Sequence, residues 1–193
     1  VQAVYNGSAN FAGSSDSTHN LIVTNPLTVV SFNVMFGTVP ETYNVTTGTR
    51  NRLPWQVTGI QVVFSAPITS GDQSSLTGVT TTGFNGLGTN TLTWSISPIS
   101  LASVSAMLAG SGTDALQDSS GNGLNGGAGF TQAFKVLWGD FNDDGVVNAV
   151  DGSGVNGVRN SGVYNPFADM NGDGVVDAAD VNIVRTRLGT SLP

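Results

Sequence analysis

The first 140 residues alternate between apolar and polar side chains in several short runs, the pattern of strands that bury one face. We predict strands over residues 27–36, 58–69, 92–96 and 130–138, and a weaker one over 104–108. Pro67 is expected to end the second run because it has no N–H to donate to a sheet. The side chains expected to face the core are Val30, Phe32, Val34, Phe36, Ile60, Val62, Phe64, Leu92, Trp94, Ile96, Phe134, Val136 and Trp138.

Glycine-rich turns separate these runs, at residues 71–72, 83–88, 110–112 and 119–129. Short, two-faced strands joined by such turns predict an antiparallel β-sandwich, and a small barrel is the alternative that the pattern does not distinguish. Residues 1–24 are predicted to be irregular or an edge strand, with a loop over 12–19, because small polar residues dominate there.

The composition agrees with a mainly β fold. Gly, Thr, Ser and Asn make up 85 of the 193 residues, and 12 Asp contrast with a single Glu. Five acidic and three basic residues give residues 1–139 a net charge of −2, whereas eight and three give residues 140–193 a net charge of −5. A chain at −7 is a poor ligand for nucleic acid or an anionic membrane surface. No apolar run is long enough to predict a membrane span, and the local excess of Asp points to a bound cation.

A twelve-residue motif that occurs twice, 29 residues apart, accounts for this excess. Residues 140–151 and 169–180 are identical at eight of the twelve positions. Each copy has oxygen-bearing side chains at positions 1, 3, 5, 9 and 12 and glycine at position 6, the spacing of an EF-hand calcium loop. Alternate side chains then point at one cation, and Gly145 or Gly174 allows the sharp turn. We therefore predict two Ca²⁺ ions, one in each loop.

The ligands follow from position in the loop. Position 7 contributes a main-chain carbonyl, and position 9 binds directly or through water. Val147 and Val176, at position 8, are expected to pair across a short two-stranded bridge. Four acidic ligands in the second loop against three in the first predict tighter binding in the second. The predicted metal ligands are Asp140, Asn142, Asp144, Val146, Asn148, Asp151, Asp169, Asn171, Asp173, Val175, Asp177 and Asp180.

These residues carry two family resemblances. Residues 60–68, the later 92–94 and the turn 115–124 before a final strand resemble bacterial Ig-like domains, over about residues 25–137. The duplicated loop resembles a type I dockerin over about residues 139–190, because Asp rather than Glu closes each loop and no helix precedes the first. The resemblances imply an Ig-like sandwich over 1–138 and, over 139–193, a small α module of two EF-hand-like calcium loops, each followed by a helix.

The repeats also depart from the dockerin pattern. Residues 178–188 predict a helix with Val181, Val184 and Leu188 on its buried stripe, but three glycines make residues 152–158 a poor helix. Dockerins that bind cohesins carry hydroxyl residues before the closing Asp, whereas this chain has alanine or valine at 149–150 and 178–179. These departures leave calcium binding intact and weigh against cohesin binding.

A single glycine, Gly139, separates the last predicted strand from the first calcium loop. We therefore expect one rigid unit, with Trp138 and Phe141 at a fixed interface between the two modules.

The resulting functional hypothesis is a non-catalytic, calcium-binding assembly or anchoring unit of a secreted or cell-surface bacterial protein. Its partner would be a cohesin-like domain, as in cellulosome-like polysaccharide-degrading systems, or the rest of a larger parent protein. The alternative is a carbohydrate-binding module that uses Trp55 or Trp94, or an accessory part of a polysaccharide-degrading enzyme. Catalysis is not predicted, because the single histidine, His19, lies in a predicted loop and the acids outside the repeats occur in turn-like segments.

Overall fold

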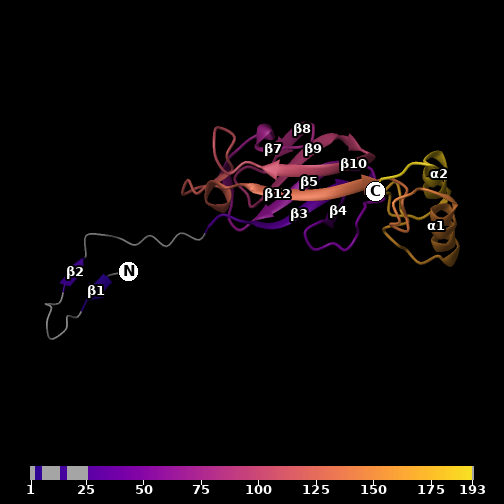
Figure 1. Ribbon diagram of the computed structural model, residues 1–193, viewed down its shortest axis with the longest axis horizontal. Helices are drawn as coiled ribbons and strands as arrows, with labels where there is room; N and C mark the ends of the chain where they lie inside the picture. Colours follow the sequence, from indigo (N-terminus) through magenta and orange to yellow (C-terminus); the bar gives the residue numbers. More distant parts are fainter. Residues whose placement is uncertain (1–2, 6–13, 17–25, 193) are drawn as a thin grey trace.

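The computed structural model describes residues 3–5, 14–16 and 26–192. A β domain is followed by a small module with two helices, so the prediction of a mainly β, antiparallel chain with a C-terminal α module is confirmed (Figure 1). Strands β1 (Ala3–Tyr5) and β2 (Ser14–Asp16) pair antiparallel, and β2 replaces part of the predicted loop over 12–19. His19 lies outside the described residues.

The β domain contains two larger antiparallel sheets. The five-stranded sheet has the order β4-β3-β5-β9-β8, and the three-stranded sheet has the order β12-β10-β7. The first is formed by β3 (Val29–Phe36), β4 (Glu41–Asn44), β5 (Val57–Phe64), β8 (Thr81–Asn85) and β9 (Thr91–Ile99). The second is formed by β7 (Leu76–Thr77), β10 (Leu101–Leu108) and β12 (Phe130–Leu137). A short pair, β6 (Ile68–Ser70) with β11 (Gln117–Asp118), and two 3₁₀ turns, η1 (Gln73–Ser75) and η2 (Leu124–Gly127), complete the domain.

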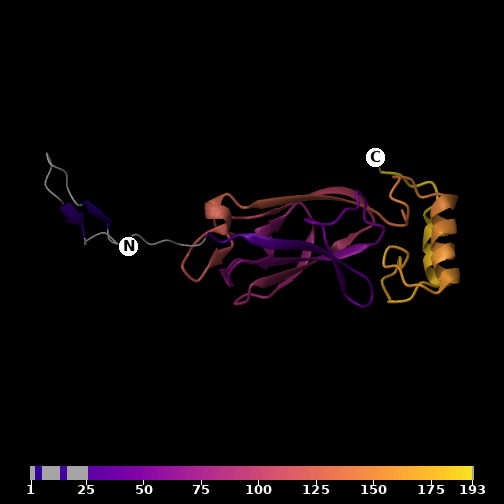
Figure 2. The same cartoon turned by 90° about the horizontal axis from the view of Figure 1, so that it is seen from below.

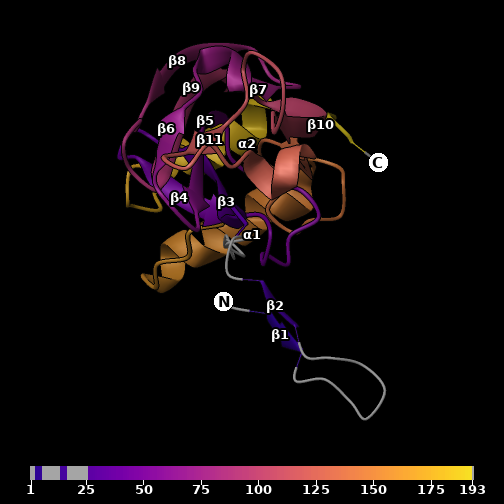
Figure 3. The ribbon, with the colours of Figure 1, turned by 90° about the vertical axis from the view of Figure 1, so that its left-hand side faces the viewer.

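One apolar core lies between the two sheets. Phe32, Ile60 and Trp94 of the larger sheet and Leu108 and Val136 of the smaller one are buried in the same cluster. Viewed along the long axis, helices α1 (Ala149–Ser161) and α2 (Ala178–Thr186) lie behind this β domain (Figure 3). The core therefore occupies the space between the layers, as a sandwich requires.

The predicted inward faces of β5 and β9 are confirmed, and three other predictions are wrong. Val30 is 62% exposed because the pairing of β3 with β5 shifts register between Val29 and Ser31, and this irregularity turns Val30 outward. Strand β12 ends at Leu137, so Trp138 follows the strand and is half-buried. Gly83, predicted in a turn, lies inside β8.

The C-terminal module contains α1 (Ala149–Ser161) and α2 (Ala178–Thr186). The prediction of a poor first helix is wrong, because α1 spans 13 residues despite its internal glycines. Asn148 and Asp151 form a capping box at its start, and Gly162 ends it in the left-handed conformation, with φ of 68°. Gly154 also has a packing role, since a Cβ there would lie 2.5 Å from Cδ1 of Phe141.

Helix α2 is shorter than predicted. It ends at Thr186, and Leu188 is 53% exposed rather than part of the buried stripe, whereas Val181 and Val184 are buried. The expected bridge between Val147 and Val176 is not among the bridges of the described residues. Instead, the Val147 N–H donates to Thr190 O (2.9 Å), and the Gly189 N–H donates to Val147 O (2.9 Å). The C-terminal segment thus occupies the position expected for the second loop.

The apolar core divides at the end of β12. Val136 belongs to the core of the β domain, whereas Leu137 packs with Val155, Met170 and Val184 in a second cluster inside the helical module. Over the described residues, neither helix has the length and apolarity needed to cross a membrane.

Candidate metal centre

The two repeated loops lie between the β domain and the helices (Figure 2). Each loop runs directly into its helix, and its closing Asp, at position 12, is the third residue of that helix. The glycine at position 6 adopts positive φ in both copies, 91° at Gly145 and 88° at Gly174, as the sharp turn requires.

The carboxylate at position 1 accepts the same pair of backbone hydrogen bonds in both loops. Asp140 accepts from the N–H groups of Asp144 (3.2 Å) and Gly145 (3.0 Å). Asp169 accepts from the N–H groups of Asp173 (3.2 Å) and Gly174 (2.8 Å). Position 1 therefore folds the first half of each loop around its own side chain.

The carboxylate at position 12 fixes the second half of each loop. Asp151 accepts from the N–H groups of Asn142 (3.1 Å) and Asn148 (2.8 Å). Asp180 accepts equivalent bonds from Asn171 (3.2 Å) and Asp177 (2.8 Å). Because the second bond also completes the capping box, one carboxylate closes the loop and starts the helix.

These four carboxylates are buried, with 0–1% of each residue exposed. Burial raises the pKa of Asp140, and the nearby Asp151 raises it further, while the Gly145 N–H and Arg50 act in the opposite direction. Burial likewise raises the pKa of Asp180, and Asp169 adds to this effect. Each loop thus holds two like charges in a desolvated position, where a divalent cation would compensate both.

The remaining predicted side-chain ligands lie toward the rim. Asn142 Nδ2 donates to Asp144 Oδ2 (2.8 Å), and Asp144 Oδ1 accepts the Val146 N–H (2.9 Å). The equivalent bonds in the second loop join Asn171 to Asp173 (2.8 Å) and Val175 to Asp173 (2.9 Å). At position 9, Asn148 and Asp177 cap the helices. Hydrogen bonds within each loop therefore hold in place the side chains that the spacing assigns as calcium ligands.

No three Asp, Glu, His or Cys side chains in the described part of the chain form a metal-binding group by themselves. The donor set nevertheless fits calcium, since every predicted donor is an oxygen and two buried carboxylates meet in each loop. Amide and main-chain oxygens at positions 3 and 7, and the Asn148 amide or Asp177 carboxylate oxygen at position 9, would have to contribute to each shell. The individual ligand assignments stay predictions.

Comparison with known proteins identifies the module. Residues 138–189 match the family model of the dockerin type I domain. The C-terminal module is type I dockerin-like. The match covers both loops and both helices, and it confirms the resemblance drawn from the repeat. Neither the curated proteins nor the solved structures yield a match to the chain. Type I dockerins are calcium-binding, non-catalytic assembly modules. The match assigns this general function to the C-terminal module.

The residues of the β domain that hold the dockerin-like module are not among those expected from the sequence. The Arg50 guanidinium donates to the carbonyls of Asp140 (2.6 Å) and Phe141 (2.9 Å) and lies 4.8 Å from the centre of the Phe167 ring. Asp143, at loop position 4, accepts the N–H groups of Asn51 (2.8 Å) and Arg52 (2.8 Å). The one available signal was two arginines at 50 and 52 in a chain with only six basic residues.

Aromatic side chains complete this contact. Trp55 Nε1 donates to Pro166 O, and Trp138 Nε1 donates to Met170 O, both at 2.9 Å. Trp138 thus contacts the dockerin-like module as expected, and Arg187 lies 3.8 Å above its ring. The ring of Phe141 packs inside the module, and its backbone carbonyl accepts a hydrogen bond from Arg50 of the β domain.

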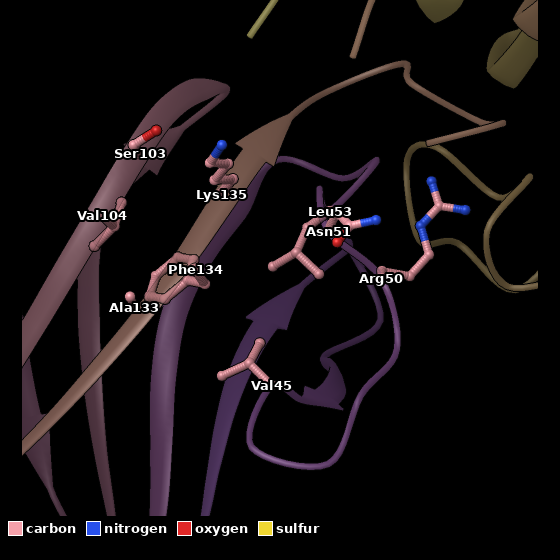
Figure 4. A pocket seen from close by; sticks show the side chains of 9 residues that line it. All are labelled: Val45, Arg50, Asn51, Leu53, Ser103, Val104, Ala133, Phe134 and Lys135. Carbon is pink, nitrogen blue, oxygen red and sulfur yellow. The ribbon is translucent and has the colours of Figure 1, made fainter. Parts of the chain in front are cut away.

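The candidates for sugar stacking are not exposed. Trp55 and Trp94 are 1% and 0% exposed, respectively, so neither offers a face to a carbohydrate. A cleft of about 320 Å³ opens on the β domain beside Val45, Leu53 and Phe134. Arg50 borders this cleft, but its guanidinium points away from Val45 and Phe134 (Figure 4) and bonds to the first calcium loop.

Proposed function

We propose that this protein is a calcium-dependent assembly or anchoring unit in which two Ca²⁺ ions stabilise the dockerin-like module. The observation that carries the proposal is the same hydrogen-bond frame in both loops, built on two buried carboxylates in each. Duplicated frames of this kind hold two buried carboxylates in each loop, and a hard cation with oxygen ligands would compensate their charge. The ions would be held by the twelve residues that the loop spacing assigns.

We propose residues 1–138 and 139–193 as the two structural units. The division of the apolar core between Val136 and Leu137 supports this boundary. The backbone and side-chain contacts of Arg50, Trp55 and Trp138 support one rigid assembly of the two. An Ig-like assignment for the sandwich remains part of the proposal.

The surface left for a partner is formed by the helices, since the loops face the β domain (Figure 2). Between α1 and α2 lies a groove of about 320 Å³, bordered by Ala149, Val181 and Leu188. Residues 149–150 and 178–179 are exposed and apolar at the helix starts. We propose a cohesin-like domain, or the rest of a larger parent protein, as the partner of this face, in a secreted or cell-surface bacterial polysaccharide-degrading system. Carbohydrate binding by the sandwich has less support, because both of its candidate tryptophans are buried.

The proposal is tested by calorimetric titration of the chelator-stripped full chain with calcium. We expect two binding events, one lost in Asp140→Ala and the other in Asp169→Ala. Asp114→Ala, which removes a carboxylate outside both loops, serves as the control and should leave both events intact. The absence of binding heat in the unaltered protein, with the fold intact by circular dichroism, would refute the proposed function.

A further inference from the structure

Position 4 of each calcium loop contacts the β domain. In the first loop, the Asp143 carboxylate accepts the backbone N–H groups of Asn51 and Arg52, both at 2.8 Å. In the second, the Val39 N–H donates to Gly172 O at 3.2 Å. The two calcium loops therefore contact the same β domain through equivalent residues, which lie 29 positions apart in the sequence.

Both position-4 residues have left-handed backbones, with φ of 64° at Asp143 and 61° at Gly172. Only the second is glycine, so the first loop adopts an unfavourable conformation that Asp tolerates better than most residues. The two hydrogen bonds from the Asn51 and Arg52 N–H groups compensate for the cost of this backbone conformation. At Gly172, a Cβ would lie 2.4 Å from Gly37 Cα, so the backbones of the two modules touch where neither has a side chain.

Arg50 extends this contact to a residue that the loop spacing assigns to calcium. Its guanidinium binds the main-chain carbonyls at positions 1 and 2 of the first loop, and its Nε donates to Arg52 O (3.2 Å). The residue at position 1 is Asp140, whose buried carboxylate organises the loop. Segment 50–52 thus contacts positions 1, 2 and 4 of the first loop, on both sides of the predicted ligand Asn142.

We propose that docking of the β domain and calcium binding are thermodynamically coupled, through segment 50–52 for the first loop and residues 37–39 for the second. Arg50 and Asp143 are positioning residues for the first calcium ion. Coupling is reciprocal, so whatever docking adds to calcium affinity, calcium adds to docking. The inference rests on the proposed calcium binding of the loops and adds the β domain as a determinant of their affinity.

The test is a calcium titration of full-length variants by calorimetry. Asp143→Gly removes the carboxylate, keeps the left-handed backbone favourable and reproduces the residue found at the same position of the second loop. Arg50→Met removes the guanidinium while keeping the length of the side chain. We expect either change to weaken the first site on the order of tenfold, a common size for coupled sites, with the second site unchanged. Arg159→Met, an exposed arginine on α1, should change neither.

Tryptophan emission gives a second readout that does not depend on heat of binding. Trp55 and Trp138 both donate to carbonyls of the dockerin-like module, so undocking exposes them and shifts emission to the red. In the unaltered protein, chelation should lower the urea midpoint of this shift. In Asp143→Gly, the midpoint should be lower even with calcium present. Unaltered affinity and midpoint in both variants would overturn the inference alone, whereas no calcium binding in the unaltered protein would overturn the proposed function with it.

Discussion

Glycines of helix α1 show how single residues decide packing in this module. Gly154 faces the ring of Phe141, and Gly157 faces open space, although the two lie only three residues apart in the same helix. Helix propensity alone treats them alike, at about 1 kcal/mol below alanine. Their surroundings distinguish them, because one position leaves no room for a methyl group and the other does.

We predict opposite effects for alanine at these two positions. Gly154→Ala should destabilise the protein by about 1–3 kcal/mol, because the new Cβ would lie 2.5 Å from Cδ1 of Phe141 and the ring must move. Gly157→Ala should stabilise it by about 0.5–1 kcal/mol through reduced backbone freedom of the unfolded chain. Urea unfolding with calcium present measures both, and equal effects at the two sites would contradict the packing argument.

Individual residues also mark what sequence pattern could and could not predict. The loop spacing placed all four buried carboxylates, because the periodicity of a calcium loop is local and survives in a twelve-residue window. Val30 was misplaced because the register shift in β3 is set by pairing with β5. The bond between Arg50 and Asp140 joins residues 90 positions apart, and no local pattern carries it.

Each calcium loop and its helix form one element through a shared capping box. At the start of α1, Asn148 caps the Val150 N–H (2.7 Å), and Asp177 caps the Ala179 N–H (2.6 Å) at the start of α2. Helix α1 forms despite its glycines, because this cap and packing against Phe141 outweigh the low helix propensity of the segment. Loop closure and helix initiation therefore depend on the same side chains.

Substitution of the first cap should separate its two functions. Asn148→Ala should cost about 1 kcal/mol of stability by removing the cap and should weaken calcium binding in the first loop. Asn148→Asp copies the second loop, so it should keep the cap and strengthen calcium binding by adding a charge. Thermal unfolding and calorimetry distinguish these outcomes, and weaker calcium binding in Asn148→Asp would contradict the role assigned to position 9.

The whole molecule is organised around the contact between the two modules. Arginine, tryptophan and backbone groups of the β domain bond to the segments before the helices, and Arg52 also donates to Leu192 O after α2. The helices face outward (Figure 1). The module family was predictable from the duplicated motif, whereas this arrangement was not, since only the single glycine between the modules indicated a rigid connection.

Close approach of the two backbones makes docking sensitive to one methyl group. Gly37→Ala would place a Cβ 2.5 Å from Gly172 O in a backbone with φ of 87°, so we expect it to open the contact at the second loop. Gly88→Ala, at a similar φ of 84° with open space around it, controls for the strain of the substitution itself. ¹⁵N relaxation should then show faster, independent tumbling of the modules in Gly37→Ala alone. A single correlation time in both variants would contradict the docking role of this glycine pair.

Thermal unfolding of the full chain, followed by tryptophan emission with and without calcium, tests the central claim most directly. If two sites bind calcium and the modules are coupled, saturating calcium should raise the emission transition by on the order of 10 °C relative to chelator. The transition should respond although Trp55 and Trp138 belong to the β domain side of the contact. Identical transitions in calcium and chelator would show that the repeated loops neither bind calcium nor stabilise the docked assembly.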